Sequence, residues 1–76
     1  MTTENELKVN ARGLSAPGPR LMVETALEMT PARLLRVVVS DQGAVDDLKV
    51  YFGERGANVK IDQVGEEFHV IVELEG

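Results

Sequence analysis

The sequence predicts an α+β two-layer sandwich of element order βαβαββ, in which a mixed four-stranded sheet carries two helices on one face. Apolar and polar residues alternate near both ends of the chain, as in half-buried strands. Two segments between them show the spacing of amphipathic helices, and the apolar run Leu34–Val39 separates these two segments. A chain of 76 residues holds one domain. We therefore expect a flexible N-terminus at 1–5 and a single domain at 6–76.

The first predicted strand leads into a segment rich in proline and glycine. Leu7, Val9 and Ala11 alternate with polar residues, which predicts a strand with one buried face. In the segment that follows, Ser15 is expected to cap a helix, and proline is tolerated in the first helical turn. In this junction the prolines restrict the backbone that leads into the N-terminus of the helix, where the positive end of the helix dipole lies.

The first predicted helix has an apolar side and a polar side. Its polar side carries Arg20, Glu24 and Glu28. Its apolar residues recur at helical spacing and are expected in the core: Met22, Val23, Ala26, Leu27 and Met29. Thr30-Pro31 ends the helix, because proline disfavours helical dihedral angles in the residue before it.

The second half of the chain predicts a central strand, a helix and a hairpin. Leu34–Val39 is the central strand, and Asp41 is placed to cap the next helix. Asp46 and Asp47 are expected in the first turn of that helix, where the dipole favours acids. Its buried stripe is expected to hold Val45, Leu48 and Phe52, with Tyr51 at the edge and Gly56 as a left-handed C-terminal cap. The two closing strands alternate around a Gly65-Glu66 turn and carry these apolar residues: Val59, Ile61, Phe68, Val70, Val72 and Leu74.

Charge and composition exclude several classes of function. With 13 acidic and 8 basic residues the net charge is −5, which disfavours a phosphate-binding surface and therefore nucleic acid as a partner. No apolar run approaches the roughly 20 residues of a membrane span, and Met1 to Leu7 does not resemble a secretion signal, so we expect no membrane association and a cytoplasmic location. The chain has no cysteine, which excludes disulfides, a thiolate nucleophile and sulfur-ligated metals.

The visible polar candidates have ordinary structural interpretations. His69 lies on a strand with no second ligand or nucleophile paired to it by spacing, and we expect a partly exposed residue. The acidic neighbours Asp46-Asp47 and Glu66-Glu67 are interpreted as solvated surface and helix-dipole partners. We predict no metal site and no cofactor. Ser15 is a better helix cap than nucleophile, because no histidine or lysine is tied to it.

Residues 12–19 nevertheless resemble a known motif. They read Arg12, Gly13, Leu14, Ser15, Ala16, Pro17, Gly18 and Pro19, and this order is similar to the Arg-Gly-Leu-x-Cys-Pro-x-Pro motif of the TusA/SirA-like sulfur carrier proteins. The resemblance extends over nearly the whole chain and includes the hydrophobic strand that leads into Asp41. It implies the fold of the C-terminal domain of translation initiation factor 3. Ala16 stands where the family has its reactive cysteine.

The resemblance implies a sulfurtransferase-type carrier and its partners. In the family the cysteine accepts sulfane sulfur as a persulfide from a desulfurase or rhodanese-type donor and passes it to an acceptor or relay protein. The remaining motif residues, Arg12–Leu14 and Pro17–Pro19, then form the motif and docking surface, and we expect a monomer with transient heteromeric contacts. The pathways that the family serves are transfer RNA thiolation, molybdenum-cofactor synthesis and sulfur oxidation.

Alanine at position 16 leaves two explanations open. A methyl group has no lone pair or redox chemistry, so the chain is expected to form no persulfide. Either Ala16 replaces a cysteine that the natural protein has, or the protein is a paralogue that has lost the chemistry. The second explanation predicts a partner-binding or regulatory module that uses the same loop. RNA binding, suggested by fold analogy alone, is opposed by the charge balance. Arg12 and Arg20 are interpreted as ordinary surface charge.

Overall fold

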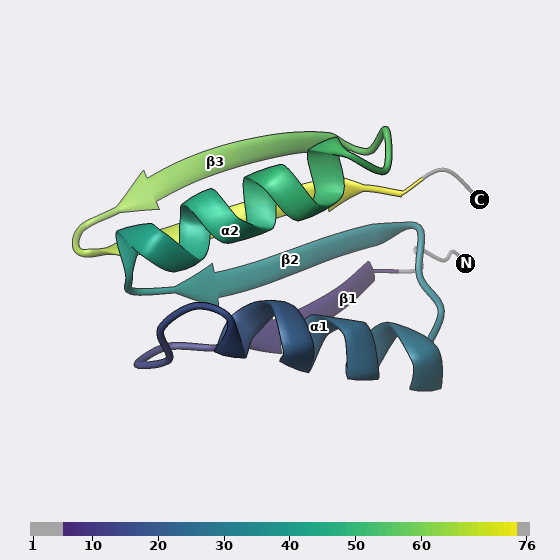
Figure 1. Cartoon of the computed structure of the whole chain (residues 1–76), viewed down its shortest axis with the longest axis horizontal. Helices are drawn as coiled ribbons and strands as arrows, with labels where there is room; N and C mark the ends of the chain where they lie inside the picture. Colours follow the sequence, from purple (N-terminus) through teal and green to yellow (C-terminus); the bar gives the residue numbers. More distant parts are fainter. Residues whose placement is uncertain (1–5, 75–76) are drawn as a thin grey trace.

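The computed structural model describes residues 6–74 of the chain. Six elements follow one another in the predicted order βαβαββ (Figure 1). They are β1 (Glu6–Asn10), α1 (Gly18–Met29), β2 (Leu34–Val39), α2 (Gln42–Gly53), β3 (Asn58–Val64) and β4 (Glu67–Glu73). The predicted N-terminal segment 1–5 lies outside the described residues, as do 75–76, so the domain boundaries stay a prediction.

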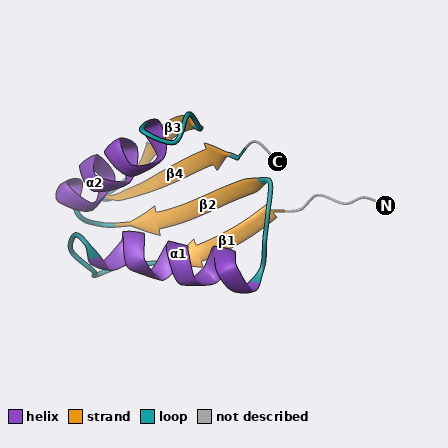
Figure 2. Cartoon of the chain, turned by 45° about the vertical axis from the view of Figure 1, so that its right-hand side comes forward, coloured by secondary structure: helices purple, strands orange, loops and turns teal. Residues whose placement is uncertain are grey.

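The sheet is mixed, as the sequence predicts. Its strand order is β1-β2-β4-β3. β1 pairs with β2 in parallel, and β4 is antiparallel to both β2 and β3. Figure 2 shows both helices over the same face of this sheet. The fold class, a two-layer sandwich with two helices on one face, is therefore confirmed.

The core lies between the helices and the sheet, with β2 at its centre. Side chains alternate along β2, so that Leu35, Val37 and Val39 are fully buried while the residues between them are only half-buried. The hydrophobic residues of the core come from both layers: Val9, Ala11, Val23, Leu35, Val37, Val39, Ala44, Val45, Leu48, Phe52, Val70 and Val72. No helix within residues 6–74 has the length and hydropathy that crossing a membrane requires.

The start of α1 differs from the prediction. The helix begins at Gly18 with Pro17 as the N-cap residue, and no side chain caps it. Ser15 is therefore not the cap; its carbonyl instead accepts a hydrogen bond from the Gly18 N–H at 2.8 Å. The helix begins three residues after Ser15, and Pro17 rather than Ser15 occupies the N-cap position. Pro19 lies in the first turn, as expected for proline.

The buried side of α1 is narrower than the sequence suggests. Val23 is fully buried, and Ala26 and Leu27 are partly buried against the core. Met22 and Met29 are 41% and 79% exposed, so their expected place in the core is wrong. Val23, Ala26 and Leu27 share one stripe at spacings of three and four residues, whereas Met22 and Met29 are seven residues apart on a neighbouring stripe that faces solvent.

In α2 the expected buried stripe and C-terminal cap are confirmed, but the prediction that Asp46 and Asp47 lie in the first turn is wrong. Val45, Leu48 and Phe52 are buried, and Gly56 has a positive φ of 78° after the helix. The first turn contains no acidic residue. Because the helix already begins at Gln42, Asp46 and Asp47 lie in its second turn rather than its first.

Asp47 joins the two helices through Arg20. The Arg20 Nε donates to Asp47 Oδ2 at 3.1 Å, and its Nη1 donates to Glu24 Oε2 at 3.4 Å. Both side chains are partly buried, so Arg20 is not the isolated surface charge that the sequence suggests. The guanidinium is held between two carboxylates on neighbouring helices.

Asp41 is the N-cap residue of α2, and replacing it tests how much the cap stabilises the fold. The Asp41 side chain accepts from the Ala44 N–H at 3.1 Å. We expect Asp41→Ala to lower the free energy of unfolding by about 1 kcal/mol, because that amide loses its side-chain acceptor and keeps only the Asp41 carbonyl at 3.1 Å. Urea denaturation provides the measurement, and Asp41→Asn, which keeps an acceptor oxygen, should lose far less. Equal losses in the two variants would contradict a capping role.

Candidate functional site

The loop between β1 and α1 is a sequence of tight turns. The Leu14 N–H donates to the Ala11 carbonyl at 3.3 Å, and Gly18 then closes a second turn onto Ser15. Gly13 has a φ of +82°, a conformation that side-chain-bearing residues rarely adopt. The Ala16–Pro17 peptide bond is cis. This loop, dark blue in Figure 1, carries all the residues of the motif except its last two, which begin α1.

Two contacts from other elements hold the loop. The Gly13 N–H donates to the Ser40 hydroxyl at 2.9 Å. The Arg12 guanidinium donates through Nε and Nη2 to the two carboxylate oxygens of Glu67, at 2.6 and 3.1 Å. Such a two-bond arrangement fixes orientation as well as distance. The loop is therefore attached to the ends of β2 and β4.

Neither contact was predicted from the sequence. Sequence patterns indicate solvated surface for Glu67 and ordinary surface charge for Arg12, yet the two residues form an ion pair although they lie 55 positions apart. The signal lies in the strand register, which pairs Val39 with Phe68 and so places Ser40 and Glu67 at one end of the sheet. That register follows from the tertiary fold and cannot be read from local patterns.

Electrostatics supports the Arg12–Glu67 pair. The hydrogen bond from Arg12 lowers the pKa of Glu67 below its usual value, and the same bond raises the pKa of Arg12. Both side chains are partly exposed to solvent, 46% for Arg12 and 36% for Glu67, so the stabilisation is small. Because the folded-state pKa of Glu67 is depressed, the stabilisation is present above the usual glutamate pKa. It is lost as pH falls through the folded-state value.

This pair predicts a pH-dependent mutant effect. We expect Glu67→Gln to lower the Tm slightly at about pH 7 and by a smaller amount at an acid pH below the depressed folded-state pKa of Glu67, where the natural carboxylate is itself protonated. Thermal unfolding followed by circular dichroism at both pH values gives the comparison. Glu66→Gln, at the exposed neighbouring position, is the matched control. A Tm difference for Glu67→Gln that is the same at both pH values would contradict the ion-pair interpretation.

The motif residues differ sharply in exposure. Arg12 through Pro17 are exposed, Gly18 is half-buried and Pro19 is buried. Leu14 covers Gly18, since a Cβ added at Gly18 would lie 3.4 Å from the Leu14 Cβ. Ala16 is therefore at an accessible position, and Pro19 anchors the start of the helix in the protein interior.

Ala16 lies two residues before the first residue of α1, but few amide groups remain free there. The Gly18 N–H is used by Ser15, Pro19 has none, and the Leu21 N–H donates to the Pro17 carbonyl at 3.1 Å. Among the amides of Gly18–Leu21, only that of Arg20 has no backbone acceptor within residues 6–74. The first turn of α1 thus offers an anion the helix dipole and one amide.

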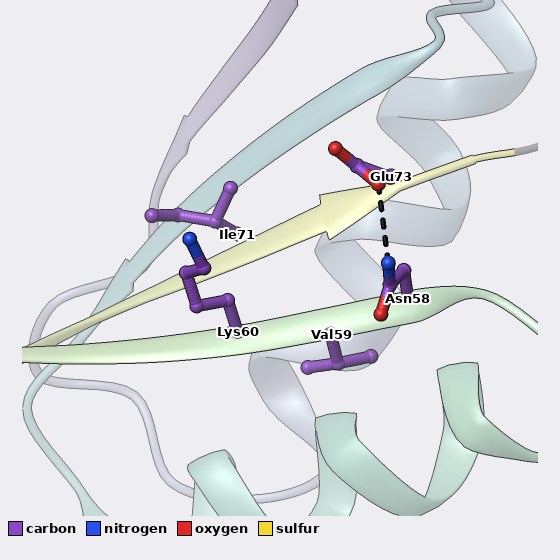
Figure 3. Close-up of a pocket in the computed structure, with 5 residues that line it drawn as sticks. All are labelled: Asn58, Val59, Lys60, Ile71 and Glu73. Atoms are coloured by element: carbon purple, nitrogen blue, oxygen red, sulfur yellow. Dashed lines mark hydrogen bonds between the residues drawn. The ribbon is translucent and has the colours of Figure 1, made fainter.

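Other parts of the molecule offer less chemistry. Within residues 6–74 no group of three or more His, Cys, Asp and Glu residues is placed to hold a metal ion. His69 is half-buried, as expected, and its Nδ1 lies 3.4 Å from Arg36 Nη1. A shallow hollow at the far end of the sheet is lined by Asn58, Val59, Lys60, Ile71 and Glu73 (Figure 3). In it Asn58 donates to Glu73 at 3.2 Å, and no residue of the motif takes part.

Comparison with known proteins identifies the family. The family model described as sulfurtransferase TusA matches residues 7–74, which is nearly the whole chain. The chain belongs to the TusA sulfurtransferase family. A TusA-family chain is a sulfur carrier domain that acts with sulfur-relay partners. This one has no cysteine and so has no residue that forms a persulfide.

A solved structure shows the same fold. The crystal structure of a SirA-like protein from Desulfitobacterium hafniense superposes with a TM-score of 0.78 at 15% sequence identity. The match covers 92% of this chain and 99% of that one. A comparison with curated protein sequences found no match. The TusA family assignment therefore rests on the family model, and the solved structure supports the fold.

Proposed function

We propose that the loop Arg12–Pro19 is a sulfur-relay site in which position 16 receives the transferred sulfur, and that this chain, with Ala16, takes up none. One observation carries the proposal. Ala16 is exposed immediately before α1, at the position that corresponds to the family's cysteine, while the surrounding motif is intact and held by Ser40 and Glu67. The site has the backbone of a carrier but lacks the sulfur atom.

The chemistry that the site is built for requires a thiolate. A cysteine thiolate at position 16 would attack the outer sulfur of a donor persulfide, forming a new S–S bond while the donor S–S bond breaks. The donor cysteine leaves as a thiolate, so charge is conserved and no external oxidant or reductant is needed. The helix dipole favours the attacking thiolate, because it lowers the pKa of a thiol near the positive end.

The partners of such a site are proteins. We assign it a donor of the desulfurase or rhodanese type and an acceptor or relay protein, reached through short-lived contacts by a monomer. Nucleic acid and membranes are not assigned as partners. The cytoplasmic location expected from the sequence stays a prediction.

A second candidate function follows from alanine itself. The chain has no cysteine at any position, yet its motif loop keeps every other fixed residue and both tertiary contacts. A partner-binding or regulatory module that no longer transfers sulfur would have these properties. An alanine codon at position 16 of the gene favours this function, and a cysteine codon excludes it.

Sulfur uptake by an Ala16→Cys variant tests the first function. Intact mass after incubation with a cysteine desulfurase and L-cysteine shows whether one sulfur atom is added. For the second function, the unmodified chain should retain its partners and lose them when Pro17 and Pro19 are replaced by alanine.

A further inference from the structure

β3 forms one edge of the sheet, with β4 as its only strand partner within residues 6–74 (Figure 1). All 7 of its residues pair with β4 in unbroken register, and none of them is proline. In such a strand, alternate residues direct their N–H and C=O groups away from the neighbouring strand. The outward groups of β3 form no backbone hydrogen bond to other parts of residues 6–74. β3 is therefore a template on which a further strand can pair.

The side chains of β3 also leave room for a neighbour. Val59 and Ile61 pack against the core but are only partly buried, because the strand lies at the edge of the sheet. Asn58, Lys60 and Asp62 are exposed on the other face of the strand. Figure 3 shows Val59 and Lys60 on opposite sides of β3. A strand added beside β3 would bury more of the apolar surface of Val59 and Ile61.

The sequence of β3 is complementary to itself in an antiparallel pair. When two copies pair about a two-fold axis at Ile61, the Lys60 of each copy lies opposite the Asp62 of the other. Opposite charges placed directly across an antiparallel pair stabilise it, and like charges destabilise it. Neither Lys60 nor Asp62 forms an ion pair within residues 6–74, so both are available to a second copy.

The other edge strand lacks this complementarity. β1 has 5 residues, and Lys8 is the middle one. Two β1 strands that pair antiparallel about this residue place Lys8 opposite Lys8, which is unfavourable. The strand that fits a second copy is therefore β3, and a two-fold pair of this kind closes on itself instead of growing into a fibre.

We propose that β3 is a dimer interface, at which the β3 strands of two copies pair antiparallel and join two four-stranded sheets into one. The inference goes beyond the sulfur relay and does not depend on it. The motif loop follows β1 at the opposite edge of the sheet, so both loops stay exposed in the dimer. The net charge of −5 on each copy opposes association. The dimer therefore forms reversibly from the monomer as the protein concentration rises.

Sedimentation equilibrium at about 0.15 M salt tests the interface, since this salt screens repulsion between distant charges more than between charges in contact. We expect Lys60→Asp and Asp62→Lys each to raise the Kd of the dimer about tenfold or more, because each creates two like-charge pairs. Asp62→Lys changes the net charge by +2, from −5 to −3, so an effect of net charge alone would instead strengthen the dimer. An equal mixture of the two variants should form a heterodimer, because the two acids of one strand then face the two lysines of the other.

Lys8→Asp is the matched control. It makes the same change of charge at an exposed lysine on the opposite edge strand, and its dimer Kd should stay within about twofold of that of the unmodified chain. All three positions are exposed, so the variants should fold, which circular dichroism checks. An unmodified chain that stays monomeric at concentrations up to about 1 mM overturns the interface. A mixture of Lys60→Asp and Asp62→Lys that does not associate, or a Lys8→Asp variant that weakens the dimer as much as Lys60→Asp, also overturns it.

Discussion

Ala16→Cys is expected to convert an inert chain into one that gains a single sulfur atom from a cysteine desulfurase supplied with L-cysteine. The unmodified chain should gain none, because it contains no thiol at all. The new side chain would be exposed, and it would lie before α1 in a loop already held by Arg12 and Gly13. The reaction therefore needs no rearrangement of the loop, only the missing thiolate.

Ser15→Cys is the matched control for this experiment. It introduces a thiol one residue earlier on the same exposed loop. A small polysulfide should load both variants, since any accessible thiolate reacts, whereas the desulfurase should load position 16 faster. Equal loading of the two variants by the desulfurase would show that position 16 has no special role. Failure of Ala16→Cys to gain sulfur under conditions that load a known carrier would remove the sulfur-relay proposal.

The pKa of the introduced thiol gives an independent readout. The helix dipole favours the thiolate, but only the Arg20 amide in the first turn lacks a backbone acceptor within the described residues. We therefore expect the thiol pKa at position 16 to lie below that at position 15, as measured by the pH dependence of alkylation. A pKa at or above the ordinary cysteine value would mean that the dipole does not act on this position.

Leu48→Ala is expected to have the largest effect on stability. Leu48 is fully buried on α2 between the two layers. Removing its side chain costs about 2–5 kcal/mol, because transfer free energy is lost and a cavity remains. A domain of this size has a free energy of unfolding of roughly 4–11 kcal/mol, so Leu48→Ala should remove a large part of it. The urea midpoint and slope give the free energy of unfolding.

Leu21→Ala provides the comparison for Leu48→Ala. It makes the same chemical change at a half-exposed position of α1 and should alter the free energy of unfolding by less than about 0.5 kcal/mol. Similar losses at the two positions would contradict the assignment of Leu48 to the core and of Leu21 to the surface.

The fold could be predicted from local patterns because the apolar residues of each element recur with the period of a helix or of a strand. The apolar run Leu34–Val39 predicts a central strand, and the alternation around Val70 and Val72 predicts a strand with one buried face. The methionines of α1 were misplaced for a physical reason. Apolar spacing shows that a helix has an apolar side, but it does not show how wide a stripe the sheet covers. Met22 and Met29 extend that side beyond the core.

The candidate site was predictable only in part. Its motif is contiguous, so residues 12–19 could be recognised in the sequence. The groups that hold it are not contiguous: Glu67 reaches Arg12 from the last strand and Ser40 reaches Gly13 from the end of β2. Such contacts depend on strand register, which emerges only when the whole sheet is assembled. The absence of free amides at Gly18 and Pro19 likewise depends on the turn geometry.

The position of β4 inside the sheet constrains how the protein is made. Among the strands of residues 6–74, the last lies between β2 and β3, and β3 has β4 as its only sheet partner there. Until Glu67–Glu73 leaves the ribosome, β3 has no neighbour and Val70 and Val72 are missing from the core. The domain should therefore fold only after β4 has been synthesised, and a transcript truncated before β4 should yield a chain that proteases remove.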